Sequence, residues 1–269
     1  MTRLTEEQIR PVAAALAEQE ADLISKTGLD YAGLAAAANG ISRDTVTKSA
    51  FEYEIAAITV TSGLGVITGF AESVAAILQR MGFSVFVPEA MDINGIYEAR
   101  TRGAELLLLA DDNRYMALNV KNGRFSDNHA ATARGYVEAL ERAAGPLSGK
   151  RVLVLGCGTV GREAGKCLIG KGARPVYHDR DKTRLMDAPL PIGVERVADP
   201  AVIGEYSLIF DATTTGGWLK ADKLTPEAWI AAPGLPLSLD QEGERLFGPR
   251  LIHDALPIGT LTMLGELLG

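Results

Sequence analysis

The chain has 269 residues, 47% of them hydrophobic, and a formal net charge of −7, so it can fill two domain cores but lacks the surplus of Lys and Arg that a nucleic-acid partner requires. Its apolar runs, such as Leu106–Ala110, are far shorter than the roughly 20 residues that span a bilayer, and no apolar leader follows a basic start. Its two cysteines, Cys157 and Cys167, have neither CxxC spacing nor a nearby His, which argues against a metal site or a disulfide framework and predicts a cytoplasmic protein.

The N-terminal half begins with helical patterns and then alternates between strands and helices. Residues 5–25 predict an amphipathic helix, since Thr5 and Gln8 have capping-box spacing and apolar residues recur at helical period. Helical spacing continues over 29–39, whereas 45–54 is polar enough for a connector. Beyond it the pattern predicts strands over 54–61, 83–88, 104–110 and 115–120 and helices over 68–81, 95–102 and 130–144.

A domain boundary is expected at Gly145-Pro146-Leu147-Ser148-Gly149, because glycine and proline together interrupt regular elements. Strands that alternate with helices predict an α/β fold with a parallel sheet in each half. The apolar segment 260–268 is expected to fold back as a helix onto the first domain. We predict a substrate domain over 1–147, joined by a helix over 257–269, and a second domain over 148–256. In the second domain we expect strands over 151–155, 174–178, 207–211, 229–232 and 250–254 and a helix over 160–171.

A glycine-rich loop follows the first strand of the second domain and opens the next helix. The loop is Gly156-Cys157-Gly158-Thr159-Val160-Gly161, in which Gly156 permits the tight turn, Gly158 admits the pyrophosphate and Gly161 permits close helix–strand packing. Asp179 stands 18 residues beyond Gly161, at the end of the next strand, where a carboxylate binds the adenine ribose. Since Asp179 would repel a 2′-phosphate, the pattern predicts a Rossmann domain that binds NAD.

Further cofactor contacts are expected where later strands of this domain end. Arg180 either stacks on adenine or is a solvated surface residue. Thr213 and Pro233 follow two later strands, and such loops pass close to the ribose and the nicotinamide.

A second glycine pattern, Gly63-Leu64-Gly65 followed by Gly69, lies in the first domain and imitates a dinucleotide loop. The hydroxyls of Thr61 and Ser62 beside it favour a substrate loop instead, and an ordinary turn remains the alternative.

The segment Val60-Thr61-Ser62-Gly63-Leu64-Gly65-Val66-Ile67 resembles the pyrrolysine synthase family. Further matching blocks follow in order along the chain: Thr27-Gly28-Leu29-Asp30, Gly103-Ala104-Glu105 leading to Ala110-Asp111-Asp112, Asn119-Val120-Lys121-Asn122-Gly123, the glycine-rich loop, and Pro257-Ile258-Gly259-Thr260. The resemblance implies an NAD-dependent dehydrogenase. Its substrate would be a lysine whose side-chain nitrogen is acylated by 3-methyl-D-ornithine. Oxidation at the terminal amine, loss of ammonia and attack by the α-amine would close the pyrroline ring.

Such a dipeptide-like substrate carries ammonium groups and needs carboxylates. Asp111 and Asp112 follow a predicted strand, where open sheets place ligands, although an acidic turn exposed to water explains them equally well. Ser62 and Asn119 could bind its amide or carboxylate groups, and Leu4 with the first helix would cover it as a lid.

No residue stands out as a general base. For His129, His178 and His253 we expect structural roles, and Asp254 is the acid expected nearest the chemistry, in a position where the family pattern has a glutamate.

Two other functions remain open from the sequence. One is a related two-domain dehydrogenase of the methylenetetrahydrofolate or shikimate type, whose final helix is similar. The other is a regulator that senses NAD(H) without turnover, against which the acidic charge and the lack of a helix-turn-helix pattern argue. A homodimer is expected from analogy of fold alone.

Overall fold

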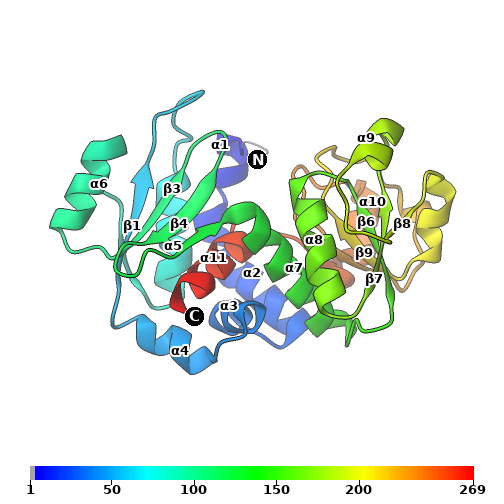
Figure 1. The fold of residues 1–269 in the computed structure, drawn as a ribbon, viewed down its shortest axis with the longest axis horizontal. Coiled ribbons are helices and arrows are strands. Elements are labelled where there is room, and N and C mark those ends of the chain that lie inside the picture. The colour runs from blue at the N-terminus through cyan, green and yellow to red at the C-terminus, as the bar shows by residue number, and fades with distance from the viewer. Residues whose placement is uncertain (1–3) are drawn as a thin grey trace. The chain divides into compact units, whose positions relative to one another are not determined.

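The computed structural model describes residues 4–269, which divide into two compact α/β units (Figure 1). One unit contains the chain up to Asp22 together with Leu29–Gly135 and Ala255–Gly269, and the other contains Leu23–Gly28 and Tyr136–Asp254. The final helix, α11 (Pro257–Leu268), packs against α3 (Tyr31–Asn39) within the first unit, which confirms the expected return of the C-terminus. No helix among the described residues is long and apolar enough to cross a membrane.

The N-terminal helices differ from the prediction at two places. The single helix expected over 5–25 is two helices, α1 (Glu6–Ile9) and α2 (Val12–Thr27), because Pro11 lacks the N–H that would continue the first helix. The capping box is present, with Thr5 Oγ1 accepting from the Gln8 N–H at 3.3 Å. The expected connector over 45–54 overlaps α4 (Arg43–Ser49), which the side chain of Ser42 caps.

The sheet of the first unit is mixed rather than parallel. Its order is β2 (Ser84–Phe86), β1 (Glu54–Thr59), β3 (Leu106–Ala110), β4 (Tyr115–Asn119) and β5 (Phe125–Asp127). Only β2 and β3 run parallel to β1, whereas β4 is antiparallel to both β3 and β5. The prediction of a fully parallel sheet was wrong because the turns on either side of β4 are too short for a crossover helix.

This pairing brings four chain segments to one edge of the sheet. The carboxyl ends of β1 and β3 lie there with the start of β4 and the end of β5, since Ala110 pairs with Tyr115 and Met116 pairs with Asp127. The helices that connect its parallel strands are α5 (Phe70–Arg80) and α6 (Asp92–Thr101), and α7 (Asn128–Ala144) begins in this unit and continues from Tyr136 in the second.

The second unit holds a six-stranded sheet that is parallel throughout, as predicted. Its order is β11 (Leu251–Ile252), β10 (Trp229–Ala231), β9 (Leu208–Asp211), β6 (Arg151–Leu155), β7 (Arg174–His178) and β8 (Glu195–Arg196). The chain order reverses between β6 and β9, which creates the switch point where open α/β sheets bind ligands. Its α-helices after β6 are α8 (Thr159–Gly170), α9 (Lys182–Asp187) and α10 (Gln241–Phe247), the last of which the sequence did not predict.

Candidate active site

The glycine-rich loop lies at the switch point of the second unit, between β6 and α8. A Cβ added at Gly156, whose φ is +93°, would lie 3.1 Å from the carbonyl oxygen of Ala212, and one added at Gly161 would overlap the carbonyl oxygen of Gly156. A Cβ at Gly158 would meet no atom within 4 Å. Gly158 is the N-cap of α8 and provides no side-chain cap, so the first N–H groups of the helix and the space beside Gly158 fit a bound phosphate.

The other residues of this loop are placed for packing or for contact through the backbone. Cys157 is buried, and burial followed by the nearby Asp179 raises the pKa of its thiol to about 11, so the thiol stays protonated at neutral pH. Thr159 and Val160 form the first turn of α8, with Thr159 exposed.

Asp179, immediately after β7, is held against the glycine-rich loop. One of its carboxylate oxygens accepts the N–H of Cys157 at 2.9 Å, and the other accepts the N–H of Asp181 at 2.9 Å. Arg180 is exposed, and its guanidinium lies 5.6 Å from the ring centroid of Trp218. Trp218 was not predicted as a site residue, although its position in the loop after β9 was a usable signal.

A buried carboxylate joins the loops after β9 and β10. Asp211 ends β9 and accepts hydrogen bonds from Ser238 Oγ and from the N–H and Oγ1 of Thr213, the latter two at 3.0 and 2.7 Å. A Cβ at Gly234, the residue after Pro233, would overlap the carbonyl oxygen of Thr213. Thr213 and Pro233 therefore lie in adjoining loops at the carboxyl edge of this sheet.

The titration of Asp211 should be visible in stability measurements. Burial raises the pKa of Asp211 above its ordinary value of 3.8, so the folded chain keeps a proton that the unfolded chain loses. The free energy of unfolding should therefore fall as pH rises from about 4 through the folded pKa. Asp211→Asn removes this titration. In urea unfolding, the free energy of unfolding of the variant should therefore rise relative to that of the wild type as pH rises. If the difference between the two free energies stays constant across this range, the pKa of Asp211 is not raised.

Two residues directly after β11, His253 and Asp254, are held by hydrogen bonds to other parts of the second unit. The hydroxyl of Tyr136 donates to the carbonyl oxygen of Asp254 at 3.1 Å and accepts its N–H at 2.9 Å, and the side chain of Asp254 is half-buried. His253 places Nδ1 2.6 Å from the carbonyl oxygen of Ala232, and burial lowers the pKa of its ring. His253 is therefore neutral at physiological pH.

A cavity of about 190 Å³ lies at the carboxyl ends of β1 and β3 in the first unit. Leu4, Phe70 and Met91 contribute apolar surface to it, and its carboxylates are Glu72, Asp111 and Asp112. Helix α1 is tied to the cavity wall because Thr68 Oγ1 donates to Glu6 Oε1 at 2.6 Å. Three carboxylates in one partly apolar cavity suit a ligand that carries ammonium groups.

Two carboxylates hold the second glycine loop beside this cavity. Asp92 accepts the N–H of Thr61 at 2.8 Å and its hydroxyl at 2.6 Å, while Asp112 accepts the N–H of Leu64. A Cβ at Gly63 would overlap the Asp112 carboxylate, so this glycine has a steric role. Ser62 is exposed on the same loop and does not line the cavity.

Asp111 and Asn119 lie at opposite edges of the sheet. The carboxylate of Asp111 closes the β3–β4 turn by accepting the N–H groups of Asn113 and Arg114, both at 2.8 Å. Asn119 pairs with Leu106 at the other end of β3 and is fully buried, and its side-chain oxygen accepts the Lys121 N–H at 3.0 Å. The structure does not bring Asn119 to the cavity, so we leave it out of the proposed site.

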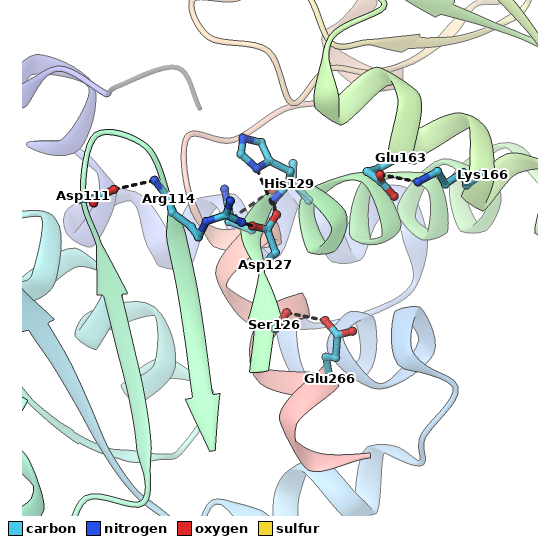
Figure 2. Close-up of polar contacts among 10 residues, drawn as sticks. Asp111, Arg114, Ser126, Asp127, His129, Glu163, Lys166 and Glu266 are labelled. Atoms are coloured by element: carbon cyan, nitrogen blue, oxygen red, sulfur yellow. Dashed lines mark hydrogen bonds and ion pairs between the residues drawn. The ribbon is translucent and has the colours of Figure 1, made fainter. Parts of the chain in front are cut away.

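A further polar network lies at the edge of the sheet that carries Asp111. Figure 2 shows the Asp127 carboxylate between Arg114 and the ring of His129. Arg114 Nη1 donates to Asp127 Oδ2 at 2.6 Å, and His129 Nδ1 lies 3.1 Å from Asp127 Oδ1. Arg114 and Asp127 were not predicted as site residues, although the pair Asp127-x-His129 was a usable signal. Among residues 4–269 no group of three or more His, Cys, Asp or Glu side chains is placed to hold a metal ion.

Comparison with known proteins gives matches over the whole chain. The family described as "Pyrrolysine biosynthesis protein PylD, N-terminal domain" matches residues 8–126. The chain is 32% identical to the pyrrolysine synthase of Methanosarcina acetivorans over 268 residues, which covers 100% of both chains. It is 34% identical to that of Methanosarcina barkeri, with 100% of this chain and 98% of the relative covered.

Solved structures with a similar fold are more distant in sequence. The quinate dehydrogenase of Corynebacterium glutamicum in complex with NAD has a TM-score of 0.54 at 14% identity, over 80% of this chain and 93% of that one. The shikimate 5-dehydrogenase of Thermus thermophilus in complex with NADP(H) and shikimate has a TM-score of 0.53 at 18% identity, over 79% and 91%. These similarities confirm the predicted fold class.

Proposed function

The chain belongs to the pyrrolysine synthase family, and from that premise we propose that it oxidises the terminal amine of 3-methyl-D-ornithyl-N6-L-lysine with NAD and so forms L-pyrrolysine. The observation that carries the proposal is the cavity lined by Glu72, Asp111 and Asp112 in a chain with full-length similarity to pyrrolysine synthases. These carboxylates would bind the ammonium groups of the substrate, while Leu4 and α1 would cover it.

The glycine-rich loop fits a dinucleotide on steric grounds. The open space at Gly158 and the uncapped start of α8 would receive the pyrophosphate, and Asp179 would accept hydrogen bonds from the adenine ribose. The loops that carry Thr213 and Pro233 would adjoin the nicotinamide, and Arg180 with Trp218 would flank the adenine. NAD, when bound, supplies the hydride acceptor for the carbon that carries the terminal amine.

Release of ammonia and ring closure would follow the oxidation. The imine hydrolyses to an aldehyde, and the α-amine of the ornithyl group condenses with this aldehyde and loses water. Asp254 remains the acid that we propose near the reacting amine, and the hydroxyl of Tyr136 holds its main chain.

The proposal is tested by incubating the purified enzyme with NAD and synthetic methylornithyl-lysine and following the absorbance of NADH. We expect NADH with this substrate and none with shikimate or quinate. Absence of NADH with methylornithyl-lysine, or faster reduction with quinate, would contradict the proposal.

Asp179→Ala is expected to weaken NAD binding and to reduce discrimination against NADP. Hydrogen bonds to a charged group contribute about 1.5–3 kcal/mol, which corresponds to a rise in Kd of roughly 10- to 100-fold. The affinity for NADP should fall less than the affinity for NAD, because the substitution also removes the repulsion between the Asp179 carboxylate and the 2′-phosphate. Calorimetric titration with both cofactors measures these changes.

Asp222→Ala is the matched control, since it removes the same charge from an exposed ion pair with Lys223. If Asp179→Ala binds both cofactors with wild-type affinity, Asp179 does not contact the cofactor.

A further inference from the structure

The three histidines of the chain differ in the partner of their Nδ1 atom. His178 and His253 place Nδ1 against the carbonyl oxygens of Val197 and Ala232, at 2.9 and 2.6 Å. His129 instead places Nδ1 3.1 Å from a carboxylate oxygen of Asp127, and its side chain is 15% exposed. A carboxylate stabilises the charged ring far better than a carbonyl does, so His129 is the histidine equipped to gain and lose a proton.

The carboxylate of Asp127 is fixed at both oxygens (Figure 2). Oδ1 accepts the main-chain N–H of His129 at 2.9 Å, and Oδ2 accepts from Arg114 Nη1 at 2.6 Å. Burial acts to raise the pKa of Asp127, but the hydrogen bonds from His129 and the charges of His129 and Arg114 lower it overall. Asp127 therefore stays ionised and holds the proton of the neutral ring on Nδ1, which leaves the lone pair of Nε2 on the opposite side of the ring.

This pair lies at the same sheet edge as the acid-lined cavity. Asp127 ends β5 beside Met116, and Ala110, which precedes Asp111, pairs with Tyr115. Two strand spacings, about 10 Å, therefore separate Asp127 from the end of β3. The main-chain N–H of Arg114 donates to Asp111, whose carboxylate lines the cavity. A dipeptide-like molecule bound at Asp111 is long enough to reach His129.

We propose that His129 is the base that deprotonates the terminal ammonium group of the substrate, with Asp127 as its positioning residue; this inference rests on the proposed function. The ammonium group R–CH₂–NH₃⁺ transfers one proton to Nε2 of His129, which gives R–CH₂–NH₂ and an imidazolium ion paired with Asp127. The nitrogen lone pair released in this way forms the C=N bond as hydride leaves the same carbon for NAD. The products of the step are R–CH=NH₂⁺ and NADH. An ammonium group has no such lone pair, so the base must act before the hydride leaves.

The first test is the pH dependence of kcat/KM. The wild type should lose activity at acid pH, where a protonated His129 ring cannot accept the proton of the substrate. His129→Asn should reduce kcat/KM by about 10²- to 10⁴-fold at neutral pH, abolish this acid limb, and regain part of the rate when imidazole is added. Asp127→Asn keeps an oxygen to accept the His129 N–H but removes the charge, so it should move the acid limb to lower pH.

The second test is independent of turnover. The ring protons of His129 are assigned by NMR in the free wild-type enzyme from through-bond correlations to its own backbone amide, and are titrated in the wild type and in Asp127→Asn. The pKa of His129 should fall when the Asp127 charge is removed, while the signals of His178 and His253 should not change.

The outcomes separate the two proposals. A wild type that forms no NADH from methylornithyl-lysine would refute the proposed function and this inference with it. An active wild type would refute the inference alone if His129→Asn keeps the rate and the acid limb. An unchanged titration of His129 in Asp127→Asn would overturn it as well, even if His129→Asn does not fold.

Discussion

Gly158→Ala is expected to weaken NAD binding strongly while the folded chain remains as stable as the wild type. The φ of Gly158 is −68°, which suits any residue, and a Cβ there meets no protein atom within 4 Å. The added methyl group would conflict only with the pyrophosphate of a bound dinucleotide. Overpacking by one carbon costs about 1–3 kcal/mol, so the Kd for NAD should rise by roughly 5- to 150-fold. Calorimetric titration and urea unfolding of the same sample measure both quantities.

Two other glycines of α8 are matched controls for this substitution. Gly161→Ala should lower both the stability of the chain and its affinity for NAD, because the added Cβ would overlap the Gly156 carbonyl oxygen. Gly170→Ala should leave NAD affinity unchanged, because a Cβ at this position meets no atom within 4 Å. Wild-type NAD affinity in Gly158→Ala would show that this loop does not bind the cofactor.

The double variant Asp111→Asn/Asp112→Asn is expected to raise the KM for methylornithyl-lysine with little change in NAD affinity. Asparagine keeps an acceptor oxygen, so the hydrogen bonds from Leu64 and Arg114 to these side chains can persist while the charge is lost. Both acids are half-buried, and hydrogen bonds to charged groups contribute about 1.5–3 kcal/mol, so we expect a rise in KM of roughly 10- to 100-fold. Steady-state kinetics at saturating NAD measures the effect.

Glu89→Gln is the control for this pair, because Glu89 is exposed beyond β2 and does not line the cavity. The KM of this control should equal that of the wild type. If the double variant also keeps the wild-type KM and turnover, Asp111 and Asp112 serve only the turn and loop that they hold.

The second unit was predictable from the sequence because its signals are local. The segment 151–155 is a strand as predicted, and the glycine-rich loop and α8 follow directly. The first unit was predicted less well because strand direction depends on pairing between segments. The strand Phe125–Asp127 is too short for a periodic pattern, and its antiparallel partner β4 was placed in a parallel sheet.

The same limit applies to the site residues. Asn119 and Asp127 are the last residues of β4 and β5. The reversal of β4 places Asn119 at the edge opposite Asp111 and brings Asp127 to the same edge as Asp111. Sequence order gives no information on which edge a side chain reaches. Trp218 was missed for a related reason, since its proximity to Arg180 depends on adjoining loops that follow different strands.

The most direct test of the account uses methylornithyl-lysine in which only the terminal nitrogen of the ornithyl group is ¹⁵N. The enzyme with NAD is allowed to complete the reaction, and NADH, ammonia and the cyclic product are measured together, with mass spectrometry locating the label. We predict one NADH for each ring formed, with the ¹⁵N recovered in ammonia and absent from the product. A product that retains ¹⁵N in its ring, or one formed without NADH, would contradict oxidation at the terminal amine carbon.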